Sequence, residues 1–198
     1  MILQPAYFPN IETFQHIMKA EELIFEVQDY YQKQTYRTRC SVYSANGLLS
    51  MNIPIKHQKM GRQYTKDVQI ENEFQWQKNH LKTLQNAYRS SPFFEYYEDE
   101  IDNLYSIKET YLLDFLFKTI DLSLKLLQNS YKYSKTDIFK PIYKDQQDLR
   151  YLIEAKTSRD ISMQTYPQVF DSKHGFLSNL SLLDLLFNEG PNASLLLK

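Results

Sequence analysis

The first 27 residues, "MILQPAYFPNIETFQHIMKAEELIFEV" (residues 1–27), decide the fold class. The apolar start stops at Pro5, which predicts a short strand over residues 2–4. Apolar residues recur at helical spacing in residues 10–20, and residues 22–27 form a β-rich apolar run. Strand, helix and strand within so short a stretch make a minimal βαβ unit, in which the two strands run parallel.

Two further segments predict more strands. Residues 31–43 begin with "YQKQTYRTRC" and are rich in Thr and Tyr, which favour extended backbone. Asn46-Gly47 then lies between two β-type runs, which is a strong hairpin signal, and residues 67–70 could add a short strand. We therefore predict an α/β fold, with α+β as the alternative. Its small mixed sheet would combine the βαβ unit with the hairpin and pack against a C-terminal helical half.

Helical patterns dominate from residue 73. Residues 73–90 carry an apolar stripe that includes Phe74, and residues 109–128 carry a longer one that predicts a core helix. The polar, proline-containing residues 128–148 predict a connector. These segments make the second part of the chain mainly helical.

A short helix is also predicted near the C-terminus. Ser181 is a suitable N-cap, and Asp184 stands three residues later, as in a capping box. Gly190 occupies the position of a left-handed residue after the helix, and Pro191 prevents its continuation. The residues between are apolar almost all round, so we expect this helix to be buried.

Length and composition narrow the possible classes of protein. We predict one domain over residues 1–198, with a strand-rich half (1–72) and a mainly helical half (73–198). The 23 Lys and Arg nearly balance the 24 Asp and Glu, so the chain lacks the basic excess of a general nucleic-acid-binding protein. We therefore expect no nucleic-acid partner. The 16 Tyr indicate either a polar-lined cavity or a wet binding surface, since buried hydroxyls need partners.

Composition also argues against several kinds of site. Cys40 is the only cysteine, which excludes an intrachain disulfide and a Cys-based zinc site; we expect it to be buried packing. The histidines have no metal-ligand spacing, so we expect no structural metal. The sequence contains neither a Gly-rich phosphate loop nor a signal peptide nor a transmembrane segment. We therefore expect a cytoplasmic protein, and a peripheral association with membranes stays open.

A row of basic residues is the first candidate binding site. If residues 31–43 form a strand, alternation places on one face Tyr31, Lys33, Thr35, Arg37 and Arg39. Three neighbouring cations predict an anion site, because Arg offers a planar bidentate fork and Lys a compact charge. The alternative is a solvated strand face beside acidic neighbours. A basic loop could fold over the same face and add donors from Lys56, His57, Lys59, Arg62 and Lys66.

The turn "QPAYFPN" (residues 4–10) is the second candidate. A strand end followed by a helix start brings backbone N–H groups to the carboxyl edge of the sheet, where ligands bind in open α/β proteins. Gln4 and Tyr7 would orient a substrate there. The alternative is that Pro5 and Pro9 only shape a tight connection.

One histidine is a candidate catalyst. Trp76 and His80 lie four residues apart on the same predicted helix, and therefore on neighbouring positions of its surface. By residue type His80 is the best candidate for a general base, with Trp76 as a stacking surface. The alternative is a structural histidine.

Five motifs in the same order resemble the WbqC-like protein family. They are "QPAYFP", "YQKQTYRTRC", the following "NG…NIPI", "WQKNHLKTLQNAYRSSPFFEYY" and "GFLSNLSLLDLLFNEGP", and they run from about residue 2 to residue 191. The family's recurrent positions are here Gln4, Pro5, Tyr7, Pro9, Lys33, Arg37, Arg39, Trp76, His80, Tyr88, Pro92, Asn179, Ser181, Asp184 and Gly190. The family's usual aromatic residue and glycine after the second proline are replaced by Asn10 and Glu12, which leaves the shape of the first turn open.

The resemblance implies a context for these residues. Members of the family are bacterial and are often associated with surface-polysaccharide and lipopolysaccharide biosynthesis. Our hypothesis is a cytoplasmic transferase for glycan or cell-envelope precursors. In it Lys33, Arg37 and Arg39 bind a small anionic or nucleotide-activated substrate. The alternative is a non-catalytic protein-binding or assembly module with a Tyr-rich surface. The sequence indicates neither a cofactor nor an oligomeric state.

Overall fold

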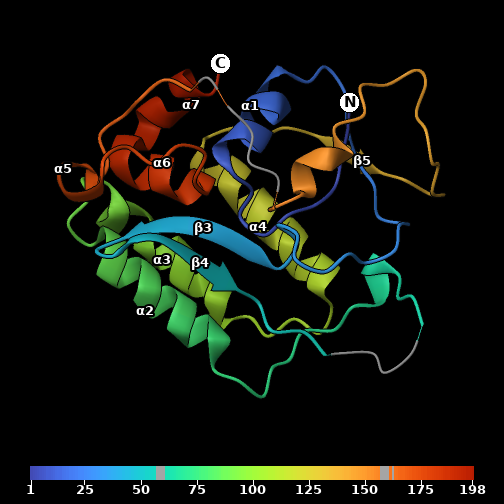
Figure 1. The fold of residues 1–198 in the computed structure, drawn as a ribbon, viewed down its shortest axis with the longest axis horizontal. Coiled ribbons are helices and arrows are strands. Elements are labelled where there is room, and N and C mark those ends of the chain that lie inside the picture. The colour runs from blue at the N-terminus through green and yellow to red at the C-terminus, as the bar shows by residue number, and fades with distance from the viewer. Residues whose placement is uncertain (57–60, 157–160, 162) are drawn as a thin grey trace.

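A three-stranded parallel sheet begins the fold. The computed structural model describes residues 1–56, 61–156, 161 and 163–198 (Figure 1). The sheet has the order β1-β2-β5 and consists of β1 (Ile2–Leu3), β2 (Leu23–Phe25) and β5 (Tyr133–Lys135). Helix α1 (Ile11–Lys19) connects the parallel strands β1 and β2, so the predicted βαβ unit is confirmed. The sequence predicted only a connector at β5, because its three residues are too few and too polar to show an apolar alternation.

The turn between β1 and α1 is held by the C-terminal part of the chain. Phe8 has a φ of +38°, which is uncommon for a bulky residue. Its carbonyl accepts a hydrogen bond from Ser181 Oγ at 3.0 Å. The side-chain oxygen of Asn179 accepts from the backbone N–H of Glu12 at 3.0 Å, and Asn10 caps α1 through its side chain. Two motifs from opposite ends of the sequence therefore build one turn.

The predicted hairpin is present as a separate sheet. Strands β3 (Arg39–Ser44) and β4 (Gly47–Asn52) pair antiparallel, and Gly47 adopts a φ of +92° at the turn. Among the described residues this hairpin does not join the parallel sheet. The α/β class is confirmed, but the single mixed sheet is wrong.

The expected strand over residues 31–43 is correct only in its second part. Residues 31–38 are not a strand, because their backbone groups bond to distant segments rather than to a neighbouring strand. Tyr31 N–H donates to the carbonyl of Gln63, and Tyr36 N–H donates to that of Ile153. The alternation of side chains predicted for this stretch therefore does not apply before Arg39.

Three long helices form most of the second half. They are α2 (Trp76–Tyr88), α3 (Phe94–Ser106) and α4 (Leu112–Leu126). The helices predicted over residues 73–90 and 109–128 are confirmed as α2 and α4, but Phe74 precedes α2 and is 64% exposed. Residues 69 and 70 form isolated bridges in place of the predicted strand. In Figure 1 the hairpin crosses the molecule between α2 and α3 on one side and α6 on the other.

The remaining elements are short. They are the 3₁₀ turns Thr65–Asp67, Arg150–Ile153 and Gly190–Asn192, and the helices α5 (Asp171–His174), α6 (Leu182–Glu189) and α7 (Ala193–Leu196). Gly190 ends α6 as predicted, with a φ of +55°. A Cβ at this position would lie 2.5 Å from the ring of Phe93, so both backbone and packing require glycine.

Helix α6 is buried as predicted, but its acidic residue has another role. Ser181 caps the helix through its side chain. The carboxylate of Asp184 does not complete a capping box; it accepts hydrogen bonds from the hydroxyls of Tyr88 at 2.7 Å and Tyr166 at 2.6 Å. Burial raises the pKa of Asp184, and these hydroxyls oppose the shift. This network joins α2 to α6 inside the core.

One cluster of buried apolar residues includes both halves of the chain. Phe14 and Phe25 come from the βαβ unit, and Leu116 and Leu185 come from α4 and α6. Cys40 is buried in the same cluster, as expected, and burial raises the pKa of its thiol.

Candidate functional site

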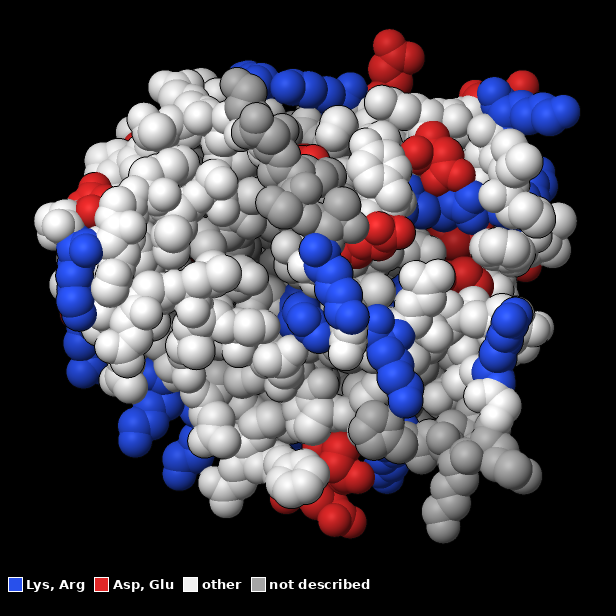
Figure 2. Space-filling view, in the orientation of Figure 1, with Lys and Arg blue, Asp and Glu red and all other residues white. Residues whose placement is uncertain are grey.

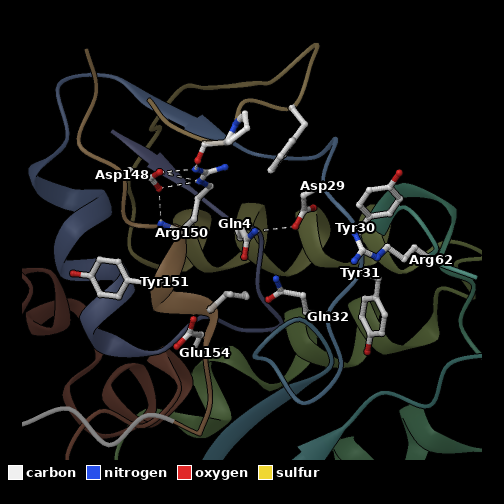
Figure 3. Close-up of a pocket in the computed structure, with 13 residues that line it drawn as sticks. Gln4, Asp29, Tyr30, Tyr31, Gln32, Arg62, Asp148, Arg150, Tyr151 and Glu154 are labelled. Atoms are coloured by element: carbon white, nitrogen blue, oxygen red, sulfur yellow. Dashed lines mark hydrogen bonds and ion pairs between the residues drawn. The ribbon is translucent and has the colours of Figure 1, made fainter. Parts of the chain in front are cut away.

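A pocket of about 760 Å³ opens at the carboxyl edge of the parallel sheet. Gln4 directly follows β1 and Asp29 lies shortly after β2, so neighbouring strand ends supply two of its lining residues. Figure 3 shows Gln4 between the Asp148–Arg150 pair on one side and Tyr30 on the other. We call this the carboxyl-edge pocket. Its place in the fold is the one where open α/β sheets bind ligands.

The floor of the pocket is organised around one carboxylate. Asp29 accepts hydrogen bonds from Gln4 Nε2 and Thr65 Oγ1, both at 2.8 Å, and forms an ion pair with Arg37. Arg37 is fully buried. Burial raises the pKa of Asp29 and lowers that of Arg37, and the opposite charge of each partner counteracts the shift of the other. The pair therefore places balanced charges beneath the pocket.

Several buried polar atoms at or beneath this floor have no hydrogen-bond partner among the described residues. They are Gln4 Oε1, Arg37 Nε and Arg37 Nη1. Buried polar groups are normally hydrogen-bonded, and an unmade bond carries a desolvation penalty. The atoms belong to two of the three side chains that bond Asp29, so fixed geometry and unused hydrogen-bonding capacity occur together at and beneath the floor.

One wall of the pocket contains an arginine whose donors are engaged. Arg150 Nε donates to Asp148 at 2.9 Å, and its two terminal nitrogens donate to the carbonyls of Lys140 at 3.0 Å and Pro141 at 2.9 Å. Hydrogen bonds to Asp148 raise the pKa of Arg150. This guanidinium holds the chain segment before it in place and offers little further charge to a ligand.

The rim of the pocket supplies aromatic faces and a cation that pairs with no described carboxylate. Tyr30 stacks on Tyr64, with ring centroids 4.5 Å apart. The guanidinium of Arg62 lies 5.8 Å from the centroid of Tyr30, and Arg62 forms no ion pair with any described residue. Flat rings beside a free guanidinium can bind a planar or sugar ring that carries an anionic group.

The predicted basic loop reaches the pocket only in part. Arg62 lines the rim, and Lys66 donates to the side chain of Gln28 at 3.0 Å. His57 and Lys59 lie outside the described residues. Among the described residues on the face shown in Figure 2, basic and acidic side chains are interspersed, as the net charge of −1 leads one to expect.

The row of three cations predicted on one strand face does not form. Lys33 is exposed in a turn, Arg37 is buried in its pair with Asp29, and Arg39 is half-buried in β3. None of the three lines the carboxyl-edge pocket, whereas Tyr31 does. The physical reason is the turn structure of residues 31–38, which removes the alternation. A role for these cations in binding stays a prediction.

Three other predicted site residues meet in a buried group. We define the Tyr7–His80 cluster as Tyr7, Trp76, His80 and Tyr105, all of which are buried. The hydroxyl of Tyr7 lies 2.8 Å from His80 Nδ1 and also bonds the hydroxyl of Tyr105. The rings of Trp76 and His80 meet edge to face, with centroids 5.2 Å apart. Tyr7 thus contacts the predicted pair of α2 residues. None of these side chains lines the carboxyl-edge pocket.

The histidine of this cluster is neutral at pH 7. Burial lowers the pKa of His80 to about 4, against a smaller opposite effect of a hydrogen bond with the backbone of Asn52. A neutral imidazole can accept a proton, but here its Nδ1 already faces Tyr7. The assignment of His80 as a base stays a prediction.

Sequence reasoning missed most of the residues that build the pocket. Asp29 carried a usable signal, because it follows β2 at the same sheet edge as Gln4. Asp148 and Arg150 carried none, since the chain returns to this edge after the helical half. In the described residues no group of three or more His, Cys, Asp or Glu could hold a metal ion. In the same part of the chain no helix has the length and apolarity needed to span a membrane.

Comparison with known proteins gives one match. A sequence model of the WbqC-like protein family matches residues 4–160, which include the pocket residues Gln4 and Asp29 and the Tyr7–His80 cluster. The tail motif near residues 175–191 lies outside this match. No curated protein and no solved structure matches the chain significantly. The match covers most of the sequence, and the chain therefore belongs to the WbqC-like protein family.

Proposed function

We propose that this WbqC-like protein is a cytoplasmic transferase in the biosynthesis of bacterial surface-glycan or cell-envelope precursors, and that its substrate binds in the carboxyl-edge pocket. The observation that carries the proposal is the position of Gln4. It is a recurrent position in the family resemblance, it directly follows β1 at the edge where open α/β sheets bind ligands, and its Oε1 is buried without a partner among the described residues.

The chemistry of the pocket favours a substrate with a ring and an anionic group. Tyr30 and Tyr31 offer flat surfaces, and Arg62 offers a guanidinium that no described carboxylate occupies. Arg37 would act indirectly by holding Asp29 in position. A nucleotide-activated or phosphorylated sugar combines these features, and a carboxylate-bearing precursor is the other candidate.

The catalytic step is proposed with His80 as the base; because His80 does not line the carboxyl-edge pocket, the acceptor hydroxyl or amine would have to bind outside that pocket. Its low pKa keeps the imidazole neutral at pH 7 but makes it a weak base, so a bound substrate would have to raise this pKa toward 7. Because Tyr7 occupies His80 Nδ1, a substrate would have to replace that hydroxyl or act through it. Loss of turnover with retained substrate binding in His80→Gln would support this role.

A thermal-shift screen tests the binding proposal. The ligands are nucleotides, sugar phosphates, nucleotide sugars, and acyl or aminoacyl donors. We expect one class to raise the melting temperature of the wild-type protein, and Arg62→Gln and Tyr30→Ala to weaken this rise by removing a charge-assisted contact and a stacking surface. Matched controls are Arg89→Gln and Tyr96→Ala, which change an exposed cation and an exposed tyrosine that do not line the pocket. An equal loss in the controls would contradict the proposed site.

The exposed tyrosine pair supports a second candidate function. Tyr30 and Tyr64 are 42% and 41% exposed and stack at the pocket rim, as a protein-binding or assembly surface would require. In that case Tyr30→Ala would abolish a complex with a protein partner in size-exclusion chromatography, and none of the small ligands would change the melting temperature.

A further inference from the structure

The chain that follows β5 exposes several large apolar side chains. We call residues 137–145 the lysine–isoleucine loop. Ile138 is 65% exposed and Ile142 is 71% exposed, and Phe139 between them is 48% exposed. Single exposed apolar residues are normal, but a group of this kind on one short loop is typical of an interaction surface. The loop projects from the body of the molecule at the right of Figure 1.

This loop is braced from the inside. The carbonyls of Lys140 and Pro141 accept hydrogen bonds from Arg150, and the hydroxyl of Tyr143 donates to Glu26 at 2.9 Å. Glu26 is fully buried. The backbone is thus fixed to the core by polar contacts, while the side chains of Ile138 and Ile142 stay exposed. Their exposure therefore results from the fixed backbone conformation of the loop.

Basic residues surround the exposed apolar side chains. A hollow of about 660 Å³ lies between β5 and the loop, and its lining includes Lys135, Lys140 and Lys144 together with Ile138 and Ile142. The lysines form no ion pair with any described residue. The stretch from residue 132 to residue 145 contains four Lys and two Asp, so it is locally positive in a chain of net charge −1.

We propose that the lysine–isoleucine loop attaches the protein to an anionic lipid surface. Ile138 and Ile142 would enter the boundary between headgroups and acyl chains, while the flanking lysines pair with lipid phosphates. Charge complementarity alone would suit any polyanion. A soluble anion or a nucleic acid, however, would engage the lysines and leave the isoleucines in water. An apolar tip with cations beside it matches the layered chemistry of a membrane interface.

The position of the loop also relates this surface to the carboxyl-edge pocket. Phe139 and Pro141 line the pocket, whereas Ile138 and Ile142 line the hollow on the other side of the loop. Attachment would place the pocket mouth beside the lipid surface. The inference goes beyond the proposed transferase function and does not depend on it, since lipid binding requires no substrate.

Vesicle flotation of the full-length protein tests the proposal. We expect binding to vesicles of phosphatidylcholine with added phosphatidylglycerol and weaker binding to phosphatidylcholine alone. The double change Ile138→Ser and Ile142→Ser should lower binding to the anionic vesicles by about tenfold or more. The double change Lys140→Gln and Lys144→Gln should also lower it, by roughly 25-fold, and reduce the preference for phosphatidylglycerol, since each lysine near an anionic surface contributes about fivefold.

Two matched controls use residues of the same type and exposure elsewhere. They are the doubles Leu48→Ser with Leu195→Ser, both 64% exposed, and Lys78→Gln with Lys82→Gln on α2. Neither should change flotation. No flotation with anionic vesicles, or an equal loss in the controls, would overturn the proposal. Full release of the protein from the vesicles by inorganic phosphate would also overturn it, because it would indicate a soluble anion site. Retention on heparin, or self-association, without vesicle binding would overturn it as well.

Discussion

The carboxyl-edge pocket and the Tyr7–His80 cluster begin from the same turn and have opposite characters. Gln4 enters the pocket, and Tyr7, three residues later, enters the core. At and beneath the pocket floor, one polar atom of Gln4 and two of Arg37 have no partner among the described residues. In the cluster, the Tyr7 hydroxyl bonds both His80 and Tyr105. A set of suitable residue types therefore does not by itself distinguish a binding site from a satisfied polar core.

The difference between the two regions arises from what packs over each residue. Gln4 follows the end of a strand, so its side chain lies at the edge of the sheet, where only loops cover it. Tyr7 is covered by α2 and α3, which supply His80 and Tyr105. Complete hydrogen bonding in a buried place favours a structural role, and incomplete bonding beside an open pocket favours ligand binding. Substitutions in the two regions should therefore affect stability differently.

The largest effect is expected for Arg37. Arg37→Met leaves the carboxylate of Asp29 buried without its cation, and loss of one partner of a buried pair destabilises proteins by about 3–5 kcal/mol. Chemical unfolding at pH 7 measures this change. Adding Asp29→Asn should restore part of the stability, because it removes the unpaired charge. Lys33→Met is the control and should change the unfolding free energy by no more than about 0.5 kcal/mol. If Arg37→Met and Lys33→Met were equally stable, Arg37 would not be a structural cation.

A smaller effect is expected from the titration of His80. Its pKa is about 4 in the folded protein and about 6.5 when unfolded, so the unfolded state binds more protons between these values. The contribution of neutral His80 to the unfolding free energy is therefore present above pH 6.5 and is lost as the pH falls toward 4. Between pH 7.5 and pH 5 it should lower the unfolding free energy by roughly 2 kcal/mol.

The variant His80→Gln isolates this contribution. Unfolding curves at both pH values, followed by the fluorescence of Trp76, give the two free energies. The difference between pH 7.5 and pH 5 should be about 2 kcal/mol smaller in the variant than in the wild type. If both proteins show the same pH dependence, the imidazole is accessible to protons and the cluster is more open than its burial indicates.

The smallest effect compares two tyrosines that were both predicted to bind substrate. Tyr7→Phe removes a buried hydroxyl with two partners and should cost about 1–2 kcal/mol. Tyr31→Phe changes a half-buried residue at the pocket and should stay within about 0.5 kcal/mol. Thermal and urea unfolding of the two variants measure the contrast. Similar losses would mean that Tyr31 also belongs to the structural core.

The sequence predicted the local elements well and the site only in part. The βαβ unit, the hairpin at Asn46-Gly47 and the helices at α2, α4 and α6 follow from patterns that lie within each segment. Of the substrate-binding candidates, Gln4 and Tyr31 line the pocket. The predicted row of cations does not form, because the backbone of residues 31–38 bonds to other segments. A local sequence pattern does not indicate such contacts.

By itself, the sequence determined the parallel start of the fold, the buried C-terminal helix and the position of Gln4 at a strand end. These depend on apolar periodicity and on the residues that start and stop helices and strands. Only the tertiary structure decided that Arg37 pairs with Asp29 and that Tyr7 meets His80. It also brought Arg150 to the sheet edge. The physical reason is that these contacts join residues far apart in the chain, and the packing that unites them leaves no periodic trace in the sequence.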